Sequence, residues 1–343
     1  MKRQPGIDLV RCVGLLFVIS VHQFLYNGFY YQPQTGALMW ASNSCLWLFY
    51  CCNGIFMMLT GYLKCEKKFT KEYYKSLIPI LMGYLFCCVI IFPLQYLLLA
   101  EKPPMSEWIK KLVQFGNYAW YVEMYIGLLL ISPGINLMLE NIKSKKGLYL
   151  AAGVLFSLTA LNSITAWNVI PDYWKSLYPV TYYVLGAVIR KQQLRLKPWQ
   201  GLGLAAIVSM WVGLMTLLTT DKGFSNGYTQ GYGGFWTTII TVLVFLSLHW
   251  LPIGEKTGKV LAWLSGGCFE GYMLSLIPDL WAYNLVKQWH SPDKYLLVYL
   301  CVTIPIFIVS LLAGKLVHTL AEKTYKLLFL RKKREELPVS PVS

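Results

Sequence analysis

Three side chains capable of chemistry lie in the first apolar segment of the chain, residues 6–26. The segment reads GIDLVRCVGLLFVISVHQFLY and carries Asp8, Arg11 and His22 among residues suited to lipid. Charged and titratable groups are costly inside a membrane, so they are rare there and are functional candidates. An imidazole titrates near neutral pH, so it can take a proton from an alcohol or carry an acyl group itself. His22 is therefore the candidate catalytic residue, in either role.

The spacing of these residues predicts a polar stripe on one helix face. Arg11 and His22 are 11 residues apart, a rise of roughly 16 Å and close to a whole number of turns. Asp8 precedes Arg11 by three positions and can pair with it. The alternatives are that Arg11 extends to lipid phosphates and that a neighbouring helix satisfies His22.

The composition places this stripe in a membrane protein. Hydrophobic residues make up 56% of the chain and charged residues 14%, a balance that a water-soluble domain of this size does not need. Segments of about 20 apolar residues can cross the bilayer. They predict an all-α fold with about ten transmembrane helices, near residues 7–27, 42–63, 77–99, 118–139, 147–165, 175–190, 200–219, 235–252, 260–284 and 295–318.

The loops between these segments alternate between basic and nearly neutral. Lysine and arginine collect in cytoplasmic loops, so both termini are expected in the cytoplasm. The net charge of +15 follows from this bias and indicates no nucleic-acid partner. The nine cysteines lie almost entirely in the spans, without zinc-site spacing, so no metal site is expected. We expect one membrane domain, residues 1–320, and a basic cytoplasmic tail, residues 321–343.

Several motifs, in order along nearly the whole chain, resemble the acyltransferase 3 family of bacterial integral-membrane O-acyltransferases. IDLVRCVGLLFVISVHQ is similar to the family's first helix, in which Arg and His are separated by ten residues. GIFMMLTGYL resembles the Phe-x-x-Ser-Gly-Tyr end of the second helix. YYKSLIPI resembles the Arg-Ile-x-Pro entry to the third. Later similarities are in AWYVEMYIGLLLISP, YYVLGAVIRK and CFEGYMLS.

The chain departs from the family pattern at two positions. Lys75 stands where an arginine is usual, and a lysine offers a point charge instead of a bidentate fork. Ser275 replaces a late histidine, which leaves His22 as the histidine placed well inside a predicted span.

The resemblance implies transfer of an acyl group, usually acetyl, from cytoplasmic acyl-CoA to a hydroxyl of a glycan or lipid-linked sugar, in a multi-pass protein of the bacterial inner membrane. Succinyl is a second possible acyl group, and no tightly bound cofactor is expected. CoA is strongly anionic, so its site should be cationic. The expected donor contacts are Arg11, Lys68, Lys71 and Lys75, although positive-inside bias alone explains most loop lysines. The expected acceptor contacts are Trp120, Tyr26 and Tyr62.

Three acidic residues also fall inside predicted spans. Glu123, beside Trp120, is expected to orient His22 or to bind an acceptor hydroxyl, with a structural pairing equally open. Glu270 is a reasonable neighbour for Arg11. Asp279 follows Pro278 and is expected to be satisfied at the backbone freed by the kink.

A polytopic transporter or flippase for a polar or glycan substrate is the alternative. It would use Asp8, Arg11, His22 and Glu123 as a relay. The absence of a visible internal repeat and the ordered motifs favour the acyltransferase.

Overall fold

The computed structural model is built of helices. It describes residues 3–98, 119–164, 169–219, 231–286 and 291–330, together with 104, 106, 109, 288 and 289. The α-helices are α1 (Pro5–Tyr26), α2 (Ala37–Phe49), α3 (Cys52–Lys64), α4 (Lys71–Lys75), α5 (Ile78–Leu98), α7 (Trp120–Asn141), α8 (Lys145–Ala160), α9 (Tyr178–Gln192), α10 (Pro198–Thr219), α11 (Phe235–Leu248), α12 (Glu255–Leu264), α13 (Cys268–Leu274), α14 (Leu276–Leu285), α15 (Tyr295–Val298) and α16 (Ile304–Tyr325).

Short 3₁₀ and π-helical turns connect or extend these helices. They are Phe29–Tyr31, Leu161–Ser163, Asp172–Leu177, Gly231–Gly233, Ser265–Gly267, Pro292–Lys294, Tyr299–Thr303 and Lys326–Leu330. No strand occurs among the described residues, which confirms the all-α prediction. The last part of the expected basic tail, residues 331–343, and most of the loop over residues 99–118 lie outside the described residues.

Six helical segments in the described part of the chain are long and apolar enough to cross a membrane, or seven if the bent pair around Ser275 is one span. They are Pro5–Tyr26, Ala37–Lys64, Lys71–Leu98, Trp120–Asn141, Pro198–Thr219 and Pro292–Phe329. Helices α8, α9 and α11 occupy three further predicted spans but have only 16, 15 and 14 residues, fewer than the roughly 20 that a perpendicular crossing needs. The count of ten and the cytoplasmic termini therefore remain predictions.

The outer helices present large apolar side chains to their surroundings. Val89 and Leu97 on α5 are 69% and 76% exposed, and Leu316 on α16 is 64% exposed. Helices satisfy their own backbone hydrogen bonds, so such surfaces are stable in hydrocarbon and unfavourable in water. The protein is thus a multi-pass membrane protein.

Two of the predicted spans are broken. The predicted helix 42–63 is α2 followed by α3, with a break at Tyr50–Cys51. The predicted helix 260–284 is α12, a 3₁₀ turn at Ser265–Gly267, then α13 and α14, which meet at a 60° bend around Ser275. The glycines of the 3₁₀ turn and the proline at position 278 both disfavour a continuous helix. Broken spans are tolerated where neighbouring side chains or a cavity satisfy the backbone.

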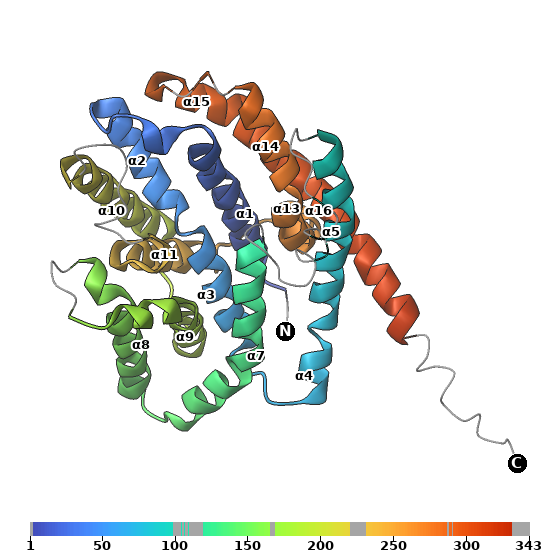
Figure 1. The fold of residues 1–343 in the computed structure, drawn as a ribbon. Helices are drawn as coiled ribbons and strands as arrows, with labels where there is room; N and C mark the ends of the chain where they lie inside the picture. Colours follow the sequence, from blue (N-terminus) through green and yellow to red (C-terminus); the bar gives the residue numbers. More distant parts are fainter. Residues whose placement is uncertain are drawn as a thin grey trace, which may run out of the picture.

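Helix α1 occupies the middle of the bundle. It lies between the α2–α3 pair on one side and α13, α14 and α16 on the other (Figure 1). The Tyr62 hydroxyl lies 3.5 Å from Gln4 Oε1 and accepts a hydrogen bond from Arg190 Nη1. Lys191 Nζ donates to the carbonyl of Leu139. These contacts bring the ends of α3, α7 and α9 to the start of α1, and we call this side the N-terminal end of the bundle.

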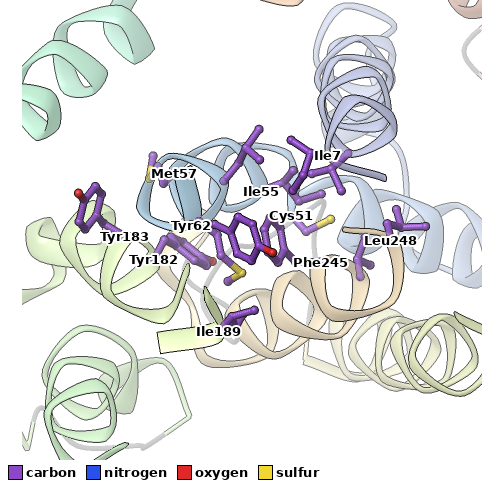
Figure 2. Close-up of a cluster of buried hydrophobic side chains, with 14 of the residues drawn as sticks. Ile7, Cys51, Ile55, Met57, Tyr62, Tyr182, Tyr183, Ile189, Phe245 and Leu248 are labelled. Carbon is purple, nitrogen blue, oxygen red and sulfur yellow. The ribbon is translucent and has the colours of Figure 1, made fainter. Parts of the chain in front are cut away.

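Helix α3 packs at very short range against α9. Gly186 lies against the Met58 carbonyl and Gly61 against the Tyr183 carbonyl, so that an added Cβ at either position would overlap a backbone oxygen. One buried cluster formed by α3, α9 and α11 surrounds this contact, and it includes Met57, Tyr182 and Phe245 (Figure 2). The Thr-Gly-Tyr motif at the end of α3 is thus explained by packing at Gly61.

We expect Gly186→Ala to lower the free energy of unfolding by about 1–3 kcal/mol, the usual cost of overpacking a core. Thermal or denaturant unfolding of the purified protein in detergent measures it. The matched control is Gly153→Ala on α8, where an added Cβ meets nothing within 4 Å. Equal stability of the two variants would contradict the close contact between α3 and α9.

Candidate active site

His22 forms a short hydrogen-bonded pair with Asp279. Nδ1 of His22 on α1 lies 2.6 Å from Oδ2 of Asp279 on α14. The Asp279 side chain is fully buried, whereas 21% of the His22 side chain is exposed. The second carboxylate oxygen, Oδ1, has no hydrogen-bond partner among the described protein atoms.

This pair fixes the chemistry available to the imidazole. A carboxylate accepts hydrogen bonds, so Nδ1 donates its proton to Asp279 and the lone pair of a neutral ring lies on Nε2. Histidines that act as bases are commonly oriented in this way by a third group. The arrangement leaves Nε2 able to accept a proton from a bound hydroxyl.

The bend of the broken span places Asp279. At the bend, the Ser275 hydroxyl donates to the Tyr272 carbonyl at 2.9 Å, and α14 begins at the next residue. Asp279 lies one turn after Ser275 and its carboxylate reaches across to α1. The backbone contact expected for its side chain is therefore replaced by a hydrogen bond with His22.

Glu123 does not occupy the orienting position. Its side chain is exposed near the start of α7, and the imidazole Nδ1 is paired with Asp279. Sequence reasoning missed Asp279 as the partner because 257 residues separate it from His22. Its position as an acid inside an apolar span was the available signal.

Asp8 joins two arginines at the N-terminal end of α1. Its carboxylate accepts from Arg3 Nε at 2.8 Å, from Arg11 Nη1 at 3.0 Å and from Ser265 Oγ at 2.6 Å. Asp8 is buried, whereas the Arg11 side chain is 31% exposed. The predicted pairing of Asp8 with Arg11 is present, and it is extended by Ser265 from the 3₁₀ turn of the broken span.

Arg11 lines a cavity of about 390 Å³ between α1, α3, α5, α7 and the broken span. Its polar lining consists of Arg11, Asn53, Thr60, Lys64, Ser265, Glu270 and His318. Aromatic and aliphatic side chains, including Phe56, Leu59, Tyr121 and Tyr272, form most of the remaining wall. The cavity is thus cationic in one part and apolar in the rest.

The cavity extends along α1 from Arg11 toward His22. Val18 also lines it, and His22 lies one turn beyond Val18 on the same face. The described lining of the cavity does not include His22. Tyr272, which lines the cavity, packs against the four buried clusters that meet around α1. The cavity therefore runs from Arg11 to Val18, and its lining ends one turn before His22.

The predicted donor lysines lie outside this cavity. Lys68, Lys71 and Lys75 are exposed on the segment before α5. That segment adjoins the cavity, because Pro79 and Ile80 line it. Lys64, at the end of α3, lines the cavity together with Arg11. Lys64 is not among the donor contacts expected from the sequence.

The predicted acceptor residues are separated in the structure. The Tyr26 ring lies 5.7 Å from the His22 ring, edge to face, and stacks on Tyr283. Trp120 is 39% exposed and stacks on Tyr232 with ring centroids 5.6 Å apart. Tyr62 is buried in the core at the N-terminal end, with the Arg190 guanidinium over its ring. Of these three, only Tyr26 adjoins the candidate base.

A second histidine–carboxylate pair lies in the cavity. Nδ1 of His318 on α16 is 2.9 Å from Oε1 of Glu270 on α13. Glu270 was expected near Arg11, and both residues line the cavity. Its hydrogen bond, however, is with His318. This pair was not predicted, because His318 falls at the very end of a predicted span.

The fold and the site define the class: a multi-pass membrane protein with an imidazole paired to a buried carboxylate and with a cationic cavity. The family model described as an acyltransferase domain, that of the acyltransferase 3 family, matches residues 4–315. The chain belongs to this family, and the protein is accordingly a membrane acyltransferase. Neither a curated protein nor a solved structure matches the chain.

We expect Asp8→Ala to lower the free energy of unfolding by about 2–3 kcal/mol, because hydrogen bonds to charged groups are lost and Ser265 loses its acceptor. Arg3→Ala is the control, since its side chain is 59% exposed and a surface ion pair is worth at most about 1 kcal/mol. Unfolding in detergent, followed by tryptophan fluorescence, compares them. A larger loss for Arg3→Ala would show that the buried carboxylate is not what joins α1 to the broken span.

Proposed function

We propose that the protein moves an acyl group, with acetyl as the first candidate, from cytoplasmic acyl-CoA to a hydroxyl of a cell-surface or lipid-linked glycan, in a bacterial inner membrane. The observation that carries this proposal is the short hydrogen bond between His22 Nδ1 and the buried Asp279 carboxylate. It supplies an oriented base, which an alcohol needs before it can attack a thioester.

In the proposed reaction His22 acts as a general base. Nε2 takes the proton of the acceptor hydroxyl while the hydroxyl oxygen bonds to the thioester carbon. The carbon–sulfur bond then breaks, and the proton on Nε2 passes to the departing thiolate, so that CoA leaves as a thiol. Asp279 keeps the ring in position and stabilises the transient imidazolium.

The cavity is the proposed donor site. CoA combines anionic phosphates with an extended pantetheine arm, and the lining combines Arg11 and Lys64 with an apolar wall. Lys68, Lys71 and Lys75 would add attraction at the entrance, because they lie on the segment that leads to Pro79. Positive-inside bias supports a cytoplasmic position for this end.

Tyr272 is the proposed gate between donor and base. It lines the cavity, and the lining ends one turn before His22. Movement of this one aromatic side chain, driven by donor binding, would let the thioester reach the imidazole. Enzymes commonly complete their sites by such substrate-driven steps.

The proposed acceptor site lies beyond His22. Tyr26 is the nearest of the candidate contacts, and aromatic rings commonly form the walls of ligand sites. Trp120 and Glu123, at the start of α7, would contact a more extended glycan.

The test of this function is acetyl transfer from labelled acetyl-CoA to membrane glycans by the purified protein and its variants. We expect His22→Gln to lower kcat by about 10²–10⁴, the usual contribution of a general base. Asp279→Asn should also lower kcat, because an amide no longer stabilises the imidazolium.

The matched control is His249→Gln. His249 is a buried histidine whose Nδ1 bonds to the Phe245 carbonyl at 2.9 Å, away from the cavity. Its variant should retain acetyl transfer per folded molecule. Full transfer by His22→Gln, or a stable acetyl-histidine formed without acceptor, would overturn the assigned role.

We expect Arg11→Gln to raise the KM for acetyl-CoA about tenfold or more, since a hydrogen bond between charged groups is lost. The KM for the acceptor should change little. Lys75→Gln provides the comparison, because the exposed ammonium of Lys75 contributes only to the electrostatic attraction at the cavity entrance. An equal rise in both KM values for Arg11→Gln would contradict its place in the donor site.

A further inference from the structure

The Glu270–His318 pair holds an imidazole against the donor cavity. The Glu270 side chain is only 4% exposed, whereas that of His318 is 36% exposed. The carboxylate is therefore fixed in the protein interior, and the imidazole that it binds lies at the cavity wall. Histidine held in this way has a defined orientation, because its Nδ1 is committed to the carboxylate.

The pair lies near the N-terminal end of the bundle, close to Arg11. An added Cβ at Gly266 would meet Lys315 Nζ at 3.3 Å and His318 Nε2 at 3.7 Å. Gly266 follows Ser265, which bonds to Asp8. Glycine at position 266 thus leaves open the space beside Nε2. Gly266 and His318 line the same cavity as Arg11 and Lys64.

The charges at this place favour an anion. Arg11 and Lys64 bring two basic side chains to the lining, and Glu270 is the acid that the described lining contains. Because Glu270 holds Nδ1–H, a proton on Nε2 creates an imidazolium whose second N–H is free to donate. Phosphate oxygens are strong acceptors for such charge-assisted hydrogen bonds.

We propose that His318, held by Glu270, donates Nε2–H to a phosphate group of the acyl donor and forms the inner end of the donor's nucleotide site. This inference rests on the proposed acyl-CoA-dependent function. It predicts that the phosphate contact is made when the imidazole carries both protons, so that donor affinity rises as the pH is lowered.

Other charged and titratable groups line the same cavity or lie beside the pair, on the elements around it. They are Arg11 on α1, Lys64 on α3, Cys87 on α5, Tyr125 on α7, Glu270 and Cys268 on α13, and Lys315 and Glu322 on α16. Histidine is the side chain that ordinarily changes its charge between pH 6 and pH 8.

The experiment measures equilibrium binding of acetyl-CoA and of S-acetylpantetheine, which lacks phosphate, to the full chain in zwitterionic lipid nanodiscs from pH 6 to pH 8. We expect His318→Gln to weaken acetyl-CoA binding about tenfold at pH 6 and to leave S-acetylpantetheine unchanged. The loss should shrink toward pH 8. His318→Lys, a permanent cation, should bind acetyl-CoA with little dependence on pH.

Lys315→Gln is the matched control. Lys315 lies one turn before His318 on α16, with its ammonium 5.9 Å from the centre of the Trp263 ring. An equal loss in both variants would mean a general field effect and would overturn the specific contact. The same loss for both ligands, or none, would also overturn it. Thermal unfolding of each variant shows whether a loss reflects binding or folding.

Two further arms separate the possible causes of failure. If the unsubstituted protein binds no acetyl-CoA, the proposed function itself fails. A lipid headgroup is the other source of phosphate, so the series is repeated with phosphatidylglycerol in the nanodiscs. If His318→Gln lowers phosphatidylglycerol retention while acetyl-CoA binding is unchanged, the site belongs to lipid and the donor assignment is wrong.

Discussion

The proposed chemistry depends on one buried carboxylate. The Asp279 side chain has no exposed surface, so a charge there needs a partner that compensates its lost hydration. Its partner is His22, 2.6 Å away on α1. The contact joins α14 to the central helix, and it also gives the imidazole the tautomer and orientation of a base. The same hydrogen bond therefore joins two helices and orients the candidate base.

The broken span supplies all three polar partners of the site. Ser265 bonds to Asp8, Glu270 to His318, and Asp279 to His22. A continuous helix would keep residues 265–279 on one straight axis, whereas the 3₁₀ turn and the 60° bend redirect them. Helix breaks inside membranes need internal hydrogen-bond partners and frequently surround cavities, and here the cavity lies beside this span.

The local features of the fold could be predicted from the sequence, and the pairings between distant segments could not. The apolar stretches gave the positions of α1, α5, α7 and α10, and helical spacing gave the shared face of Arg11 and His22. The break at Tyr50 was missed because hydropathy is averaged over a window longer than the break, whereas Pro278 indicated a kink close to the bend at Ser275. The partners of His22 and Glu270 lie 257 and 48 residues away, where only tertiary packing determines contact.

The central claim is that the acyl donor enters beside Arg11 and delivers its thioester to His22 across Tyr272. The most direct measurement is a cryo-electron microscopy structure of the protein with a non-hydrolysable acetyl-CoA analogue. The account predicts phosphates beside Arg11, the pantetheine arm along Val18, and the acyl carbonyl next to His22 Nε2 with the Asp279 pair intact. An analogue bound elsewhere, or an arm that ends at Val18 with Tyr272 still closing the way, would contradict it.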